Sequence, residues 1–229
     1  EIKDKEHLVC RLKKCIYGLK QSARCWNQKL HGVLLEIGFQ QSAADQCLYI
    51  KTEDGKRLYI LVYVDDIIAG CVDETLIDSV YHALTEHFEM TDLGPVSYFL
   101  GMEVKCEKGN YSVSLEGYIE KLIRKFGLSE AKTAKTPMDE EFLKQQDSSS
   151  ILKDTTQYRS LVGALLYISV CTPPDIAVST GILGRNVSKP TESCWVAAKR
   201  VVRYLKATKH FKLNFNKAGS DLIGYSDAD

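Results

Sequence analysis

The chain has 229 residues, of which 45% are apolar, enough to form one large folded domain or two smaller ones. No apolar run reaches the roughly 20 residues that cross a bilayer, and residues 1–10 lack the pattern of a secretory signal. These features predict a soluble intracellular protein without a membrane partner. Its eight cysteines, without a C-x-x-C pair, are expected to be reduced, and its five histidines lack zinc-site spacing.

The net charge of zero conceals an uneven distribution along the chain. Residues 1–35 carry eight Lys or Arg against three Asp or Glu, residues 36–100 carry three against twelve, and residues 185–217 carry nine against one. Two basic regions around an acidic middle could hold a polyanion at the flanks and cations at the centre. The alternative is that these charged segments are surfaces exposed to water without a ligand. The charge distribution by itself favours this alternative.

The first part of the chain predicts an α+β fold. Apolar residues at helical spacing predict a helix within residues 19–39, after a basic segment. Residues 47–70 predict three strands in a β-meander with turns at EDGK and at Asp65-Asp66. Asp73 is expected to cap a helix over residues 74–88. A hairpin with strands at residues 98–106 and 111–115, joined by the turn EKGN, and a helix over 117–127 complete the order α-β-β-β-α-β-β-α.

The second part of the chain predicts a helical region that follows a long loop. Residues 131–154 lose periodicity and predict the loop. Helical segments are expected at 158–170 and 175–188, on either side of Pro173-Pro174. A further helix is expected at 191–208, with a basic face and an apolar face. Residues 211–215 and 221–229 predict two strands.

The adjacent aspartates at the end of an apolar strand need an explanation. Two carboxylates this close repel each other, and the repulsion grows near an apolar sheet. A divalent cation such as Mg²⁺ would offset the repulsion, because it prefers carboxylate oxygens and keeps water and phosphates as its other ligands. The alternative is a turn exposed to water, because Asp is a common turn residue. For two aspartates without further context, the turn is the better explanation.

One short motif and five longer phrases, in the same order along the chain, resemble one known family. Residues 63–66, YVDD, resemble the Y-x-D-D motif of reverse transcriptases. IYGLKQSARCW (16–26), YFLGMEV (98–104), LVGALLYISVCTPPDIA (161–177) and WVAAKRVVRYLKAT (195–208) are similar to phrases of copia-type (Pseudoviridae-like) LTR retrotransposon Pol polyproteins. GYSDAD (224–229) is similar to the opening of that family's ribonuclease H domain.

The resemblance implies a right-hand polymerase palm, with a ferredoxin-like antiparallel sheet and helices, truncated at both ends. Partial fingers and palm would occupy residues 1–106, and a thumb-like hairpin and helix residues 107–136. A linker and connection region would occupy residues 137–219. The first strand of ribonuclease H, also truncated, would occupy residues 220–229.

The resemblance implies that Asp65 and Asp66 are catalytic and hold Mg²⁺ or Mn²⁺ for two-metal nucleotidyl transfer onto a primer 3′-hydroxyl. The family's third carboxylate lies in an upstream phrase that this sequence lacks, so the chain alone is expected to be inactive. Asp227 would be the first ribonuclease H carboxylate, with Asp229 as the alternative.

The resemblance also implies residues that contact nucleic acid. Those that would line the nucleotide and template side are Tyr17, Gly18, Lys20, Gln21 and Arg24. Those that would contact the nucleic-acid backbone are Lys199, Arg203 and Lys206. For the first group, a solvated basic loop before a helix is the alternative interpretation.

The implied partners are an RNA template, a DNA primer, deoxynucleoside triphosphates and the remainder of the Pol polyprotein. The implied location is a cytoplasmic virus-like particle or the nucleus, and the oligomeric state stays open. Ser22-Ala23 stands where the family usually has Ala-Pro, and Pro173 where it has Arg, which suggests a degenerate copy. The alternatives to a polymerase are a domesticated nucleic-acid-binding protein and a pseudogene product that folds poorly.

Overall fold

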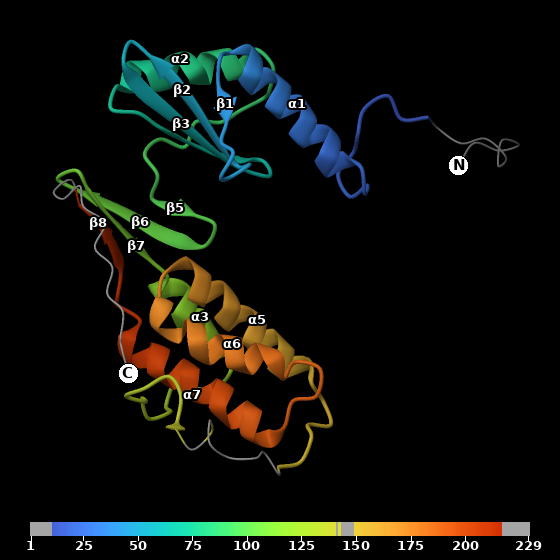
Figure 1. The fold of residues 1–229 in the computed structure, drawn as a ribbon, viewed down its shortest axis with the longest axis vertical. Coiled ribbons are helices and arrows are strands. Elements are labelled where there is room, and N and C mark those ends of the chain that lie inside the picture. The colour runs from blue at the N-terminus through green and yellow to red at the C-terminus, as the bar shows by residue number, and fades with distance from the viewer. Residues whose placement is uncertain (1–10, 141, 143–148, 217–229) are drawn as a thin grey trace, which may run out of the picture. The chain divides into compact units, whose positions relative to one another are not determined.

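The structure, a computed structural model, describes residues 11–140, 142 and 149–216. The chain divides into two compact units, unit 1 up to Gly94 and unit 2 from Pro95 (Figure 1). Each unit contains one antiparallel four-stranded sheet and helices, which confirms the mixed α and β composition. The division into fingers, palm, thumb and connection stays a prediction. Within the described ranges, no helix has both the length and the apolar composition of a transmembrane span.

Unit 1 contains the predicted helix, meander and second helix. Helix α1 spans Ser22–Glu36 and α2 spans Glu74–Thr85. The sheet has the order β1-β2-β3-β4. Its strands are β1 (Gln40–Gln41), β2 (Leu48–Glu53), β3 (Lys56–Tyr63) and β4 (Asp66–Gly70). The short edge strand β1 was not predicted, and α2 ends three residues before the expected Phe88.

Strand β3 has one buried face and one open face. Leu58, Ile60 and Val62 alternate along the strand and are at most 6% exposed, whereas Tyr59 and Tyr63 are 40% and 52% exposed. The buried side chains pack with residues of both helices, which are Leu30, Val33, Leu34, Val80 and Leu84. Each buried Leu or Ile stabilises the unit by about 1.5–3 kcal/mol, so this face holds β3 firmly.

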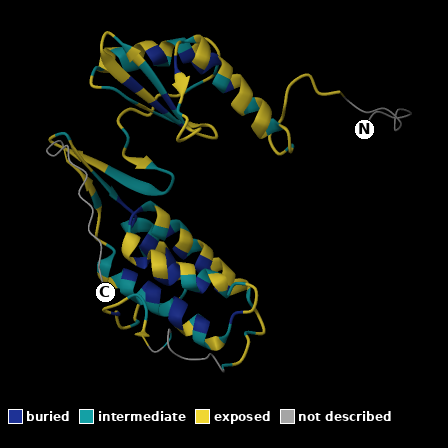
Figure 2. Cartoon of the chain, in the orientation of Figure 1, coloured by how far each residue is buried: buried dark blue, intermediate teal, exposed yellow. Residues whose placement is uncertain are grey.

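Unit 2 combines a helical bundle with a second sheet. Its helices are α3 (Glu116–Lys125), α5 (Thr156–Cys171), the 3₁₀ turn η1 (Pro174–Ile176), α6 (Ala177–Arg185) and α7 (Glu192–Thr208). Its strands are β5 (Tyr98–Phe99), β6 (Met102–Glu107), β7 (Asn110–Ser114) and β8 (Leu213–Phe215). The bundle core runs along α5 and α7, where dark blue residues gather in Figure 2.

The segment expected as one strand, residues 98–106, breaks in two. Phe99 pairs with Met102, so Leu100 and Gly101 form a two-residue turn between β5 and β6. Both residues have positive φ, 50° and 86°, which is the requirement of a type I′ hairpin turn. The prediction of an unbroken strand was therefore wrong, because the apolar side chain of Leu100 conceals a turn that is usually marked by Asn or Asp.

The C-terminal strand of unit 2 joins the hairpin of that unit. In strand β8, Leu213 pairs with Val113 and Phe215 with Tyr111. The sequence predicted residues 221–229 as the companion strand, and that segment lies outside the described residues. The strand predicted over residues 211–215 is observed over Leu213–Phe215, and its partner in the described structure is β7.

Part of the predicted long loop packs along α7. The Ala134 amide donates to the Arg203 carbonyl at 3.2 Å, and Ala134 is only 7% exposed. Further along, the Leu152 amide donates to the Pro190 carbonyl at 2.9 Å. The described part of residues 131–154 is mostly irregular, as predicted, but residues 140 and 142 are helical and Ile151 forms an isolated bridge with Thr191. The segment is bound to the bundle and does not form a free linker.

The turn between β5 and β6 is held from α5. The Tyr167 hydroxyl donates to the Leu100 carbonyl, and the Tyr167 ring lies 4.9 Å from the Tyr118 ring between centroids. A Cβ atom added at Gly101 would lie 2.7 Å from the Tyr167 hydroxyl oxygen. Gly101 is therefore required both by its φ and by the closeness of this hydroxyl.

Gly101→Ala should lower the free energy of unfolding of unit 2 by about 2–4 kcal/mol, from the positive φ and the contact with Tyr167 together. The matched control is Gly55→Ala in unit 1, where φ is 75° and no atom lies within 4 Å of an added Cβ. The control should lose only about 1–2 kcal/mol. Urea unfolding followed by Trp195 for unit 2 and by Trp26 for unit 1 measures both changes, and equal losses would contradict the close contact.

Candidate functional site

The two aspartates lie at the tip of the β3–β4 hairpin. Tyr63 pairs with Asp66, so Val64 and Asp65 form the turn and Asp66 begins β4. Cross-strand partners lie on one face of a sheet, which places Asp66 with Tyr63 on the open face of the sheet. Ile67, the partner of Val62, packs onto the core instead. Both carboxylates are exposed to solvent.

The turn residue Val64 has an unfavourable backbone conformation. Its φ is 56°, a region that β-branched residues rarely adopt and that costs about 1–3 kcal/mol. Its carbonyl accepts a hydrogen bond of 2.6 Å from the indole Nε1–H of Trp26 on α1. The Trp26 ring in turn packs edge-on against Phe88, with 5.2 Å between ring centroids. The surrounding structure therefore holds a turn that is unfavourable by itself.

Sequence reasoning did not identify the role of Trp26. The helical spacing placed Trp26 on the apolar face of the first helix, and the structure shows it half-buried there, packed against the unit 1 core. The available signal was chemical, because a half-buried indole N–H usually finds a hydrogen-bond acceptor. The acceptor is a backbone carbonyl 38 residues along the chain, which no pattern of side chains marks.

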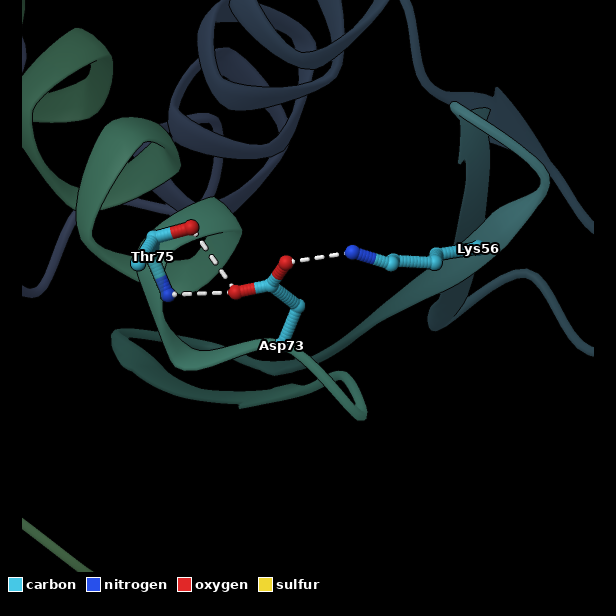
Figure 3. Close-up of polar contacts among 3 residues, drawn as sticks. All are labelled: Lys56, Asp73 and Thr75. Carbon is cyan, nitrogen blue, oxygen red and sulfur yellow. Dashed lines mark hydrogen bonds and ion pairs between the residues drawn. The ribbon is translucent and has the colours of Figure 1, made fainter.

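The base of the hairpin is tied by Asp73, as Figure 3 shows. Lys56 Nζ, at the start of β3, lies 2.6 Å from Asp73 Oδ2. Asp73 Oδ1 accepts hydrogen bonds from the Thr75 amide at 3.0 Å and the Thr75 hydroxyl at 2.8 Å. The predicted helix cap is thus confirmed. The hydrogen bond from Lys56 and the two from Thr75 lower the pKa of Asp73 from 3.8 to about 2.

Asp65 and Asp66 fit part of a magnesium shell. Both supply carboxylate oxygens, and no side chain among the residues that the structure describes forms an ion pair or hydrogen bond with either carboxylate. An exposed pair of oxygen ligands leaves room for water and phosphate, which Mg²⁺ usually keeps. Over the same described ranges, no group of three or more His, Cys, Asp or Glu side chains could hold a metal ion. The described protein therefore offers two carboxylates to a cation.

The residues expected on the nucleotide and template side lie in one exposed segment. They are Tyr17, Gly18, Lys20, Gln21 and Arg24, and all are exposed. The Ser22 hydroxyl donates to the Ile16 carbonyl at 2.6 Å and ties the segment to the start of α1. Gly18 has φ of 92°, and Tyr17 is fully exposed beside it. The structure brings these residues together, and their contacts with nucleotide or template stay a prediction.

Basic residues of α7 contact the loop that follows α3. Arg203 Nε donates to the Lys132 carbonyl, and Lys206 Nζ donates to the Ser129 carbonyl and, at 3.0 Å, to the Ala131 carbonyl. Lys199 Nζ lies 5.2 Å from the centre of the Trp195 ring. Two of the three residues thus have a structural role that the sequence did not indicate.

Phosphate contact by Lys199, Arg203 and Lys206 stays a prediction. A backbone carbonyl is a neutral acceptor, so these hydrogen bonds place no counter-charge beside Arg203 or Lys206. The expected ribonuclease H residues Asp227 and Asp229 lie outside the described residues.

Comparisons with known proteins give consistent matches. The profile of a family described as "Reverse transcriptase (RNA-dependent DNA polymerase)" matches residues 1–140. The "Retrovirus-related Pol polyprotein from transposon TNT 1-94" of Nicotiana tabacum is 34% identical over 100% of this chain and 18% of its own length. The corresponding polyprotein from transposon RE1 of Arabidopsis thaliana is 36% identical over 99% of this chain and 16% of its own length.

A shorter relative matches most of its own length. A transposon Ty5-1 protein of Saccharomyces cerevisiae is 33% identical over 90% of this chain and 67% of its own length. By contrast, the chain spans less than a fifth of each of the two plant polyproteins. No solved structure matches the chain.

Asp73→Asn should make the thermal stability of unit 1 depend less on pH in the acid range. Because the pKa of Asp73 is lowered on folding, its ionised form stabilises the fold above pH 3.8, and this contribution is lost as the pH falls to about 2. The parent should therefore lose thermal stability across this window, and Asp73→Asn should start lower and lose less. Melting temperatures followed by Trp26 fluorescence from pH 6 to pH 2 test this. The control Asp78→Asn, on the same helix, should retain the parent's slope.

Lys206→Gln should destabilise unit 2 by about 1–2 kcal/mol, because two backbone carbonyls lose a charged donor. The matched control is Lys212→Gln, an exposed position, where the change should stay within about 0.5 kcal/mol. Urea unfolding followed by Trp195 fluorescence compares the two variants. A Lys206→Gln variant as stable as the control would contradict the structural role of this lysine.

Proposed function

Because the chain belongs to the reverse transcriptase family of copia-type retrotransposon Pol polyproteins, we propose that it carries the Y-x-D-D hairpin of an RNA-directed DNA polymerase. The parent reaction joins a deoxynucleotide to the 3′-hydroxyl of a primer and releases pyrophosphate. The observation that carries the proposal is the pair of exposed carboxylates, Asp65 and Asp66, at the tip of an apolar hairpin, where no side chain of the described residues pairs with them. RNA template, DNA primer and the remainder of the polyprotein are the proposed partners.

Asp65 and Asp66 would hold Mg²⁺ or Mn²⁺ in this reaction. When bound, the ions lower the pKa of the primer hydroxyl and stabilise charge on the transferred phosphate. The work of the protein is to hold both carboxylates in place before the cations arrive, so that little rearrangement is needed. The buried face of β3, the Lys56–Asp73 ion pair and the Trp26 hydrogen bond each restrict the hairpin.

Exposed groups just before α1 and in its first turn would contact the substrate. Arg24 and Lys20 can bind phosphate oxygens, and a planar guanidinium can do so with two hydrogen bonds. The exposed ring of Tyr17 could stack on a base or sugar. On α7, Lys199 could add a contact with the nucleic-acid backbone, which fixes position and carries no sequence information.

We propose that the chain by itself does not catalyse polymerisation. The family's third carboxylate lies in a phrase without a counterpart in these 229 residues. Two aspartates can attract a cation but supply too few ligands to fix two ions about 3.5–4 Å apart. The activity then depends on a segment that supplies the missing carboxylate.

Primer extension and metal binding test this proposal together. On an RNA template with a DNA primer, the purified chain should incorporate no more deoxynucleotide than Asp65→Asn does, with Mg²⁺ or Mn²⁺. The chain should nevertheless bind Mn²⁺, measured by water proton relaxation, and the double change Asp65→Asn with Asp66→Asn should weaken that binding by at least about tenfold. Metal-dependent incorporation that disappears in Asp65→Asn would overturn the expected inactivity.

A second function is favoured by the absence of a third metal carboxylate within the described ranges. A domesticated nucleic-acid-binding protein would keep the scaffold without the chemistry. Binding of an RNA–DNA duplex would then weaken with salt, survive the double Asp change and drop when Lys199, Arg203 and Lys206 are neutralised. Because Arg203 and Lys206 also hold the loop after α3, Lys199→Gln is the decisive single variant. Mn²⁺ binding that depends on both aspartates would favour the polymerase function instead.

A further inference from the structure

We propose that Trp26 is a positioning residue for Asp65 and Asp66, because its indole N–H holds the peptide group that leads into Asp65. This inference rests on the proposed metal function of the two aspartates. It extends that function to a residue on α1 that touches neither the metal nor a substrate.

The turns of the described structure show why this contact is unusual. Four residues other than glycine have positive φ in the described ranges, namely Asp54, Val64, Leu100 and Lys108. Asp54 and Lys108 are polar, and like Leu100 each is followed by a glycine with positive φ, as in type I′ hairpin turns, whereas Val64 is followed by Asp65. Among the residues that the structure describes, no side chain donates a hydrogen bond to the carbonyl of Asp54 or Lys108.

The two apolar members of this group behave differently. The Val64 carbonyl accepts a hydrogen bond from Trp26, and the Leu100 carbonyl accepts one from Tyr167. In each case the donor is an aromatic side chain of a helix in the same unit. An aromatic donor thus accompanies each unfavourable turn that lacks a polar residue at this position. Val64 is the more demanding case, because its side chain is β-branched.

Planarity of the peptide bond links the indole to the catalytic pair. The Val64 carbonyl and the Asp65 amide belong to the same peptide plane, which rotates as one rigid group. A hydrogen bond of 2.6 Å to the carbonyl therefore restricts rotation of the plane from which the Asp65 side chain departs.

The indole can serve as a fixed donor because its own position is fixed. Trp26 lies one helical turn before Leu30, which is 2% exposed in the core. The Phe88 ring contacts the Trp26 ring edge-on, with 5.2 Å between centroids. Lys29 Nζ lies 4.9 Å from the centre of the same Phe88 ring and 3.5 Å from the His87 carbonyl. The Trp26 ring is therefore fixed by its place on α1 and by Phe88 of the segment after α2, which Lys29 also contacts.

The decisive variant is Trp26→Phe, which keeps an aromatic ring and removes the N–H donor. Replacement of Trp26 by benzothienylalanine, in which sulfur substitutes for the ring N–H, keeps the shape more closely and guards against loss of packing. The matched control is Trp195→Phe, the same change at the second of the two tryptophans, in unit 2. Phe88→Leu removes the ring contact but leaves the N–H donor.

Two measurements on the full chain give the result. Amide hydrogen exchange by NMR compares residues 63–67 at the hairpin tip with residues 49–61 in the strands. Mn²⁺ affinity is measured by water proton relaxation. Loss of the donor should speed exchange at the tip by about fivefold, the effect of one neutral hydrogen bond, with little change in the strands. Mn²⁺ should bind several-fold more weakly, and Trp195→Phe should change neither quantity.

Three results would overturn the inference. These are unchanged exchange at residues 63–67, a uniform rise throughout unit 1, and a local rise with unchanged Mn²⁺ affinity. If the parent shows no Mn²⁺ binding that Asp65→Asn removes, the proposed metal function fails separately. A local rise in exchange then still supports Trp26 as the residue that positions the hairpin, and its absence refutes this role.

Discussion

Burial of one face of strand β3 is the interaction on which unit 1 depends. A hairpin that carries two neighbouring carboxylates at its tip must be held by forces that act elsewhere, because the tip itself supplies none. The alternating side chains of β3 bury Leu58, Ile60 and Val62 against the helices. The Lys56–Asp73 ion pair closes the base, and Trp26 holds the turn. Apolar burial gives most of the stability, and the two polar contacts fix the position of the hairpin at its base and at its turn.

Unit 2 uses basic and aromatic side chains in a related way. Tyr167 donates to the turn that contains Leu100, and Arg203 and Lys206 donate to carbonyls of the loop after α3. A row of cations on a helix is readily interpreted as a surface for phosphate. Here the same side chains also replace the hydrogen bonds that an irregular segment cannot make for itself. Both roles are compatible, because a lysine has three donors.

Local patterns in the sequence were sufficient to predict much of this fold. Alternation predicted β2, β3 and β4, and the cap at Asp73 followed from its position before an apolar helical repeat. Patterns failed where the deciding partner was a backbone group. The Leu100 turn carries no polar marker, and the acceptor for Trp26 is a carbonyl that side-chain patterns cannot reveal. The aspartate pair was identified through family resemblance, because two aspartates alone are more often a plain turn.

The pairing of β7 with β8 has a consequence for the order of folding. In unit 1 the strands pair with their neighbours in sequence, so its sheet can form from contacts between nearby residues. In unit 2 Tyr111 pairs with Phe215, across roughly a hundred residues that include the helical bundle. Contacts this distant in sequence form late and slow the search for the native state. During synthesis, unit 1 can complete its sheet on the ribosome while the second sheet still waits for its last strand.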